Sequence, residues 1–331
     1  MYDRDEWLSS YREEIIDPDR EIIDPHHHLW AWRSLKPYLL DELLADTTDG
    51  HKVSQTVYIE CGWGYREDGP EHLKSVGETE FVADIAAQAA KKPDQPQIGA
   101  IVSRVDLRHP DIDATLEAHE KAGNGLFRGV RFMAAFDDEP TLSIPPHAPE
   151  GLFQDSAFRR GLHRLGELGF SFEAWQYHHQ LRDVRDLARA CPETTIVLDH
   201  FSTPLGVGKY EGKRDDIFNA WKVDMKDLAS CRNVVAKLGG LSMVDNGWGY
   251  HLGEKPTSSD QIVADQARYY HHTIDAFGPE RCMFESNFPV DRASVSYHVL
   301  WNAFKKIANR YNETEKDQLF AGTARRVYKL S

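Results

Sequence analysis

Cysteine is scarce in this sequence, and long apolar runs are absent. The four cysteines are far apart and form no C-x-x-C pair, which argues against a disulfide framework or a zinc ribbon and favours a reducing compartment. No apolar run approaches the roughly 18 to 20 residues that would cross a bilayer, and the first residues are charged. We therefore expect a cytoplasmic protein without a signal peptide, a membrane anchor or a membrane partner.

Positive charge is also in deficit. The chain has 53 acidic residues against 39 Lys and Arg, a formal net charge of -14, and no cluster of basic residues interleaved with aromatics. A groove that follows a nucleic-acid backbone needs such a cluster, so we expect no nucleic-acid partner. The hydrophobic fraction of 41% is ordinary for a globular enzyme with a sizeable core. The expected partner is a small-molecule substrate, and a homo-oligomer is left open.

A glycine-rich phosphate turn is missing as well. No G-x-G-x-x-G follows the first apolar run, which disfavours an open doubly wound sheet. Eight short apolar runs typical of buried parallel strands occur instead, at 21–24, 55–60, 97–103, 127–132, 169–175, 194–199, 233–239 and 282–286. Helical periodicity lies between them, at 80–90, 110–122, 157–168, 181–190, 215–229 and 261–277.

This alternation predicts a single-domain (β/α)8 TIM barrel of the α/β class. The barrel is expected over residues 21–331, preceded by an N-terminal helical extension over residues 1–20 in which apolar residues recur at roughly helical spacing. Two long polar connections, 62–78 and 135–154, follow the second and fourth strands. Barrel enzymes place substrate loops at such positions.

Two histidines follow the first predicted strand, in the segment Asp24-Pro25-His26-His27-His28-Leu29-Trp30. A spacing of two places the side chains of His26 and His28 on one face of the chain, which in a barrel is the interior at the catalytic mouth. Imidazole can bind a metal or hold a carbonyl oxygen near neutral pH. The alternative is a solvated, histidine-rich turn.

The same segment resembles the D-x-H-x-H-x-W signature of the amidohydrolase superfamily. Further segments are similar in kind and order to its amidohydrolase-2 branch, namely VYIEC at 57–61, RGVR at 128–131, IVLDH at 196–200, KLGG at 237–240 and FESNFP at 284–289. That branch contains lactonases for sugar lactones and pyrone dicarboxylates, and also metal-dependent decarboxylases. The resemblance implies a (β/α)8 barrel with a histidine after strand six, here His200, and an aspartate after strand eight.

The aspartate of the family corresponds to Asn287 in this chain. In the family it would deprotonate the hydrolytic water, and an amide has no useful basicity. Glu60, Glu285 and Asp291 could replace it. We select Glu60, because a carboxylate that ends an apolar strand should lie at the barrel mouth with a raised pKa, although a salt-bridged strand cap is the alternative. Glu285 shares a strand face with Asn287 and is the weaker candidate.

A divalent metal is left open. Metal-dependent relatives place a further ligand after the fifth strand, where His178 lies. The resemblance therefore implies His26, His28, His178 and His200 as the candidate ligands of one zinc or manganese ion. Other lactonase relatives resemble metal-free enzymes, and Asn287 removes a common ligand.

Further candidates for substrate binding follow the predicted strands. Arg131 ends strand four and Lys237 lies in strand seven, so either cation could pair with a substrate carboxylate or form a structural ion pair. Aromatic and imidazole side chains could surround a ring-shaped substrate or simply pack, and these are Trp30, Trp63, Trp175, Tyr177 and His178.

Taken together, the residues predict a hydrolase of a lactone or related carbonyl substrate that bears a carboxylate. His26, His28 and His200 would polarise the carbonyl, and Glu60 would activate water. Asn287 would position that water or donate to the substrate. Two alternatives stay open: a metal-dependent decarboxylase or C–C hydrolase, and a barrel that binds a ligand without catalysis.

Overall fold

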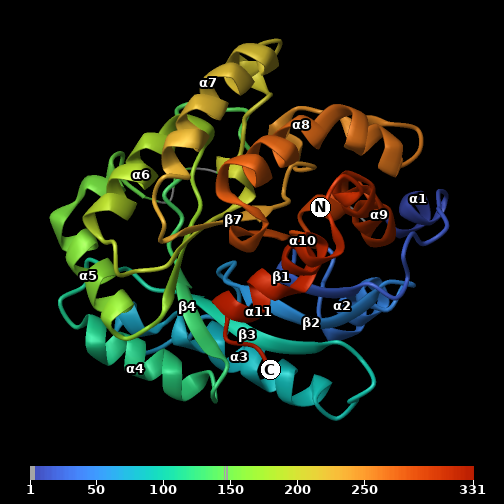
Figure 1. Cartoon of the computed structure of the whole chain (residues 1–331). Coiled ribbons are helices and arrows are strands. Elements are labelled where there is room, and N and C mark those ends of the chain that lie inside the picture. Colours follow the sequence, from blue (N-terminus) through green and yellow to red (C-terminus); the bar gives the residue numbers. More distant parts are fainter. Residues whose placement is uncertain (1–3, 145, 147) are drawn as a thin grey trace.

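Eight parallel strands form a barrel in the computed structural model, which describes residues 4–144, 146 and 148–331 (Figure 1). The strands are β1 (Glu21–His27), β2 (Lys52–Ile59), β3 (Gln97–Arg104), β4 (Phe127–Arg131), β5 (Ser171–Ala174), β6 (Ile196–Leu198), β7 (Val234–Leu238) and β8 (Cys282–Phe284). Each strand pairs with the next in sequence. The ring closes where His28 N donates to Phe288 O at 2.8 Å. The predicted TIM barrel is confirmed.

Helices cover the outside of the barrel. They are α1 (Asp5–Ser9), α2 (Leu40–Thr47), α3 (Val76–Ala89), α4 (Ile112–Ala122), α5 (Ser156–Glu167), α6 (Leu181–Ala190), α7 (Arg214–Leu228), α8 (Ser259–Phe277), α9 (Tyr297–Ala308), α10 (Glu313–Asp317) and α11 (Thr323–Val327). The six predicted helices are confirmed, with bounds that differ by up to four residues. Among the described helices, none combines the length and apolarity needed to cross a bilayer. All four cysteines are free thiols.

The N-terminal helix is shorter than the predicted extension over residues 1–20, of which residues 1–3 lie outside the described part of the chain. After α1, the polar groups of the chain bond to other elements. Ile16 N donates to Asn302 Oδ1 at 2.9 Å, and the carboxylate of Glu13 accepts from Ser259 N at 2.8 Å. These partners on α8 and α9 satisfy groups that would otherwise bond within a helix, so the segment runs extended.

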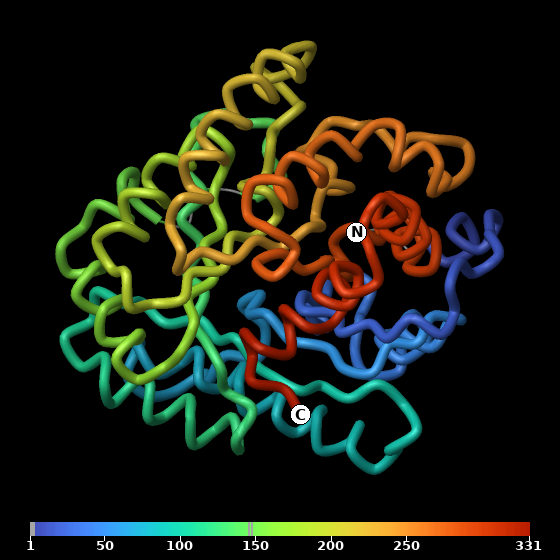
Figure 2. Tube along the Cα trace, viewed as in Figure 1, coloured from blue at the N-terminus to red at the C-terminus, as the bar shows by residue number. Residues whose placement is uncertain are grey.

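The C-terminal segment closes the amino-terminal opening of the barrel. Figures 1 and 2 show this last part of the chain, with α11, lying across the strands. Its apolar side chains pack against inward-facing strand residues, in a cluster of Ile23, Val57, Ile59, Ala100, Val102, Val197, Val235, Met283, Ala321, Ala324, Tyr328 and Leu330. Tyr328 also reaches the polar interior, where its hydroxyl donates to Glu173 Oε1 at 2.5 Å. With this end filled, the other end of the barrel is left for polar groups.

Asp24 connects β1 to the segments that follow β8. Its buried carboxylate accepts hydrogen bonds from Ser286 N at 2.9 Å and from the Tyr297 hydroxyl at 3.0 Å. Burial raises the pKa of Asp24 to about 6. A carboxyl group with a raised pKa in the folded state stabilises the fold at low pH, and this contribution is lost as the pH rises through about 6. Keeping Asp24 ionised at pH 8 thus costs about 3 kcal/mol.

Replacing Asp24 by asparagine is expected to raise the melting temperature relative to the parent protein at pH 8, because a neutral amide avoids this cost. The advantage should shrink as the pH falls below about 6 and disappear below about pH 3.8, where Asp24 is protonated in both the folded and the unfolded state. Thermal unfolding of both proteins across this pH range tests the prediction, with the exposed Asp41→Asn on α2 as control. A difference that does not change with pH would contradict it.

Candidate functional site

Charged and polar side chains gather inside the barrel toward the carboxyl-terminal ends of its strands. The buried residues of this network are His26, His28, Glu60, Arg131, Glu173, Asp199, His200, Lys237, Glu285 and Asn287. Buried charges stabilise a fold only where they are paired. The pairing therefore indicates what each group can do.

Glu285 lies between two histidines. Its Oε1 is 2.6 Å from His200 Nδ1, and its Oε2 is 2.8 Å from His26 Nδ1. The centroids of the two rings are 4.5 Å apart. Burial by itself would raise the pKa of Glu285, but the two imidazoles lower it to about 2. Glu285 is therefore a carboxylate at neutral pH and orients both rings.

The backbone around His200 is unusual. Four consecutive residues, 200–203, have φ values between +42° and +62°. Residues other than glycine rarely adopt this left-handed backbone conformation, and such backbone strain is concentrated at functional sites. Opposite them, Gly240 has a φ of +69°, and a Cβ there would lie 2.3 Å from His200 Nδ1. A glycine at position 240 thus leaves the space that the imidazole occupies.

These contacts determine the tautomers of His200 and His28. Glu285 Oε1, 2.6 Å from His200 Nδ1, requires a proton on that nitrogen, since two acceptors would repel each other. His28 Nδ1 likewise faces the carbonyl oxygen of Ile59 at 2.8 Å. Burial and the charge of Lys237 lower the pKa of His26 to about 4, so its ring is neutral. Its Nδ1 lies 3.1 Å from the Lys237 ammonium, which can only donate, and 2.8 Å from Glu285 Oε2, while its buried Nε2 has no hydrogen-bond partner in the described chain.

Lys237 lies beneath the histidines. Its ammonium is 2.6 Å from Glu173 Oε2, 3.4 Å from Asp199 Oδ1 and 3.1 Å from His26 Nδ1. Burial would lower the pKa of Lys237, but the surrounding carboxylates, Glu173 first, raise it above its usual value. The structural ion pair that the sequence left open for Lys237 is thus present, and its charge is balanced inside the protein.

Arg131 and Glu60 face each other across the barrel. Arg131 Nε donates to Glu60 Oε1 at 2.9 Å, a second guanidinium nitrogen donates to the Glu60 carbonyl, and Nη1 is 3.5 Å from Asp199 Oδ2. Glu60 Oε2 has no hydrogen-bond partner among the described residues. Both residues therefore belong to an ion pair, which was the alternative to a catalytic or substrate-binding role for each of them. One carboxylate oxygen of Glu60 remains without a hydrogen bond in the described chain.

Asn287 follows β8 with a φ of +55°, a conformation that asparagine tolerates better than most residues. Its Nδ2 donates to Asp291 Oδ1 at 3.0 Å, and burial raises the pKa of Asp291 to about 7. The carboxylate nearest the histidines is thus Glu285, two residues before the family position. The alternation of side chains along the strand had predicted that Glu285 shares a face with Asn287.

The other predicted contact residues lie at some distance from one another. Trp175 and Tyr177 pack together where the loops after β4 and β6 meet, and Trp175 Nε1 donates to Thr203 Oγ1 at 3.1 Å. The predicted loop 135–154 runs through this cluster, although residues 145 and 147 lie outside the described chain. His178 has its ring 5.2 Å from that of Tyr210. Trp63 lies edge-on to Trp32 at 4.9 Å.

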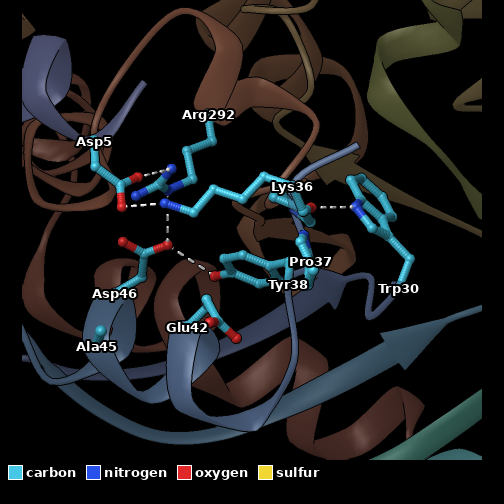
Figure 3. Close-up of a pocket in the computed structure, with 10 residues that line it drawn as sticks. Asp5, Trp30, Lys36, Pro37, Tyr38, Glu42, Ala45, Asp46 and Arg292 are labelled. Atoms are coloured by element: carbon cyan, nitrogen blue, oxygen red, sulfur yellow. Dashed lines mark hydrogen bonds and ion pairs between the residues drawn. The ribbon is translucent and has the colours of Figure 1, made fainter. Parts of the chain in front are cut away.

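Trp30 faces a separate pocket between α1 and α2 (Figure 3). Its Nε1 donates to the carbonyl of Lys36 at 3.2 Å. Asp5 pairs there with Lys36 and with Arg292, the latter at 2.8 Å, and the Tyr38 hydroxyl donates to a carboxylate on α2. Ion pairs occupy this pocket and fasten the N-terminal segment to the barrel, so it is an attachment point.

Three potential metal ligands converge in the described part of the chain. One ligand atom each from His26, Asp199 and His200 lie within 4.8 Å of one another. His26 Nε2 and both oxygens of Asp199 are buried without a hydrogen bond there. Two imidazoles and a carboxylate are donors that zinc and manganese accept, so these residues fit a divalent ion. This set differs from the predicted one, because it includes Asp199 and leaves out His28 and His178.

Sequence reasoning missed Asp199 and Glu173. Both carry a visible signal, since Asp199 directly precedes His200 and Glu173 interrupts the apolar run of β5. An acid inside a strand that is buried on both faces needs a cation nearby, and Lys237 supplies it for both.

Known proteins match this chain over nearly its whole length and share its fold. The profile of the family described as Amidohydrolase matches residues 23–330. Uncharacterized protein y4mH of Sinorhizobium fredii is 30% identical, over 94% of this chain and 99% of that protein, and an L-fucono-1,5-lactonase of Burkholderia multivorans is 26% identical, over 93% and 96%. A crystal structure of an amidohydrolase from Burkholderia multivorans with bound zinc has a TM-score of 0.73 at 23% identity, over 94% and 99%.

Proposed function

This chain belongs to the amidohydrolase family, and on that basis we propose that it hydrolyses a cyclic ester, a lactone. The L-fucono-1,5-lactonase relative supports the choice of a lactone within the family. The observation that carries the proposal is the pairing of Glu285 with Nδ1 of both His26 and His200. At His200 this pairing places the proton on Nδ1 and leaves Nε2 as the free group.

In the proposed reaction, His200 accepts a proton from the attacking water. A carboxylate 2.6 Å from Nδ1 stabilises the imidazolium that forms. His26 is neutral, and its buried Nε2, which has no hydrogen-bond partner among the described residues, is the atom that contacts the water or the lactone carbonyl.

The bonds then change in a balanced sequence. The hydroxide oxygen bonds to the lactone carbonyl carbon, and the ring C–O bond breaks. The proton held by His200 moves to the departing ring oxygen, so the product is a hydroxy acid and the base is restored. Glu285 remains a carboxylate throughout, since its pKa is about 2.

The residues that fit a divalent ion are His26, Asp199 and His200. Such an ion, when bound, polarises a carbonyl oxygen and lowers the pKa of a bound water. Glu285 keeps the same task in that case, because a carboxylate on Nδ1 orients an imidazole toward any partner at Nε2.

The purified protein should release acid from at least one member of a panel of five- and six-membered sugar lactones and aromatic lactones, followed with a pH indicator. We also expect Glu60→Gln to lose less than about tenfold in kcat, because Glu60 is held by Arg131 rather than by a histidine. A loss above about a hundredfold would restore Glu60 as the base. Failure with every lactone would contradict the proposed function without affecting family membership.

A further inference from the structure

A groove of about 700 Å³ opens at the carboxyl-terminal ends of β2, β3 and β4. Cys61, which follows Glu60, and Met133, two residues after Arg131, line one side of it. Burial and nearby carboxylates, Glu60 among them, raise the pKa of Tyr65 in the groove, while Arg104 lowers it. Arg104 in the groove is the register partner of Arg131, so the groove adjoins the buried network.

Arg104 differs from the other cations described above. It is the last residue of β3, it is half-buried, and the described residues offer it no hydrogen bond and no ion pair. Its guanidinium lies over the ring of Phe132 at 4.7 Å. Stacking on an aromatic face leaves the edge of the guanidinium, with its fork of N–H donors, open for a planar anion.

The acids that line the groove are already paired. Arg108 binds both oxygens of Asp106, at 2.8 and 2.7 Å, and Glu71 pairs with Lys74 at 2.8 Å. These pairs cancel one another, and Arg104 is a second cation near Asp106 that forms no hydrogen bond or ion pair with the described residues. The chain has a net charge of -14. A half-buried cation without a partner among the described residues therefore favours the binding of an anionic ligand at this position.

We propose that Arg104 binds a carboxylate of the substrate, and that the apolar body of the substrate lies in this groove against Phe132 and Trp32. The inference rests on the proposed function and assigns its substrate class, a lactone that carries one carboxylate and a flat or apolar ring. A carboxylate matches the guanidinium in a bidentate way. The single charge of a carboxylate neutralises the positive charge of Arg104, whereas a doubly charged phosphate would leave a net negative charge in the groove.

Binding is tested separately from turnover, with benzoate and benzamide as probes in isothermal titration calorimetry. We expect benzoate to bind the parent protein at least about tenfold more tightly than benzamide does. Arg104→Gln should remove this preference and leave benzamide binding unchanged, and Arg104→Lys should keep part of it. Arg182→Gln, at an exposed position on α6, removes the same charge far from the groove and should change neither affinity.

Kinetics provide the second readout. For a carboxylate-bearing aromatic lactone, Arg104→Gln should raise KM at least about tenfold with little change in kcat, because the contact is made equally in the ground and transition states. Its neutral amide analogue should show no such change. Equal benzoate affinity in the parent and Arg104→Gln overturns the proposal even if lactones are hydrolysed. Arg104-dependent benzoate binding without any lactone turnover supports the groove as a carboxylate site and rejects only the lactonase activity.

Discussion

Glu285→Gln is expected to lower kcat by at least about a hundredfold while the barrel stays folded. The amide has no charge to stabilise an imidazolium, and its N–H group must face Nδ1 of His26 or His200, which disfavours the working tautomer of that ring. General base catalysis contributes about 10² to 10⁴, and the loss of an orienting carboxylate falls in the same range. Steady-state kinetics on the best lactone, with circular dichroism of the variant, measure both parts.

The matched control is Glu280→Gln, in the exposed turn before β8, which should leave kcat unchanged. Because the pKa of Glu285 is about 2, the carboxylate stays ionised from pH 5 to 8. A folded Glu285→Gln with kcat within about fivefold of the parent would reject the assigned role. If Glu285→Gln does not fold, Glu285→Asp, which keeps the charge but shortens its reach, serves the same test.

Lys237→Met is expected to destabilise the protein by about 3 to 5 kcal/mol. The change removes the ammonium that lies 2.6 Å from Glu173 and 3.4 Å from Asp199, so Glu173 loses its cation and Asp199 keeps only Arg131. Burial already raises the pKa of Glu173 well above its usual value, so this site has little capacity for further negative charge. Urea denaturation at pH 7 measures the free energy of unfolding.

Adding Glu173→Gln to Lys237→Met should recover at least about 1 kcal/mol, since it removes the buried carboxyl group that has lost its cation. Lys226→Met, at an exposed position on α7, should cost no more than about 0.5 kcal/mol. A loss below about 1 kcal/mol for Lys237→Met would mean that the charges of Glu173 and Asp199 are balanced by other groups.

Local patterns predicted the barrel and its first histidines. Eight apolar runs separated by helical periods need only the nearest neighbours in sequence to be recognised, and β1 to β8 follow them closely. A spacing of two in the chain likewise places His26 and His28 on one face without any knowledge of the rest. The N-terminal extension was predicted less well, because the partners of Glu13 and Ile16 lie nearly 250 residues or more away.

The sequence by itself determined the fold, the histidines and the absence of the family aspartate at Asn287. The spacing of apolar residues, the alternation of side chains along a strand and the family motifs are all properties of residues that are close together in the chain. Tertiary structure alone decided which carboxylate serves the histidines. Glu60 lies 71 residues from Arg131, and Glu285 lies 85 residues from His200, so each acid acquires its partner only when the barrel closes. The same holds for Arg104, since a cation at a strand end is visible in the sequence but its lack of a partner is not. Charges act through distances across the barrel, and those distances exist only in the folded chain.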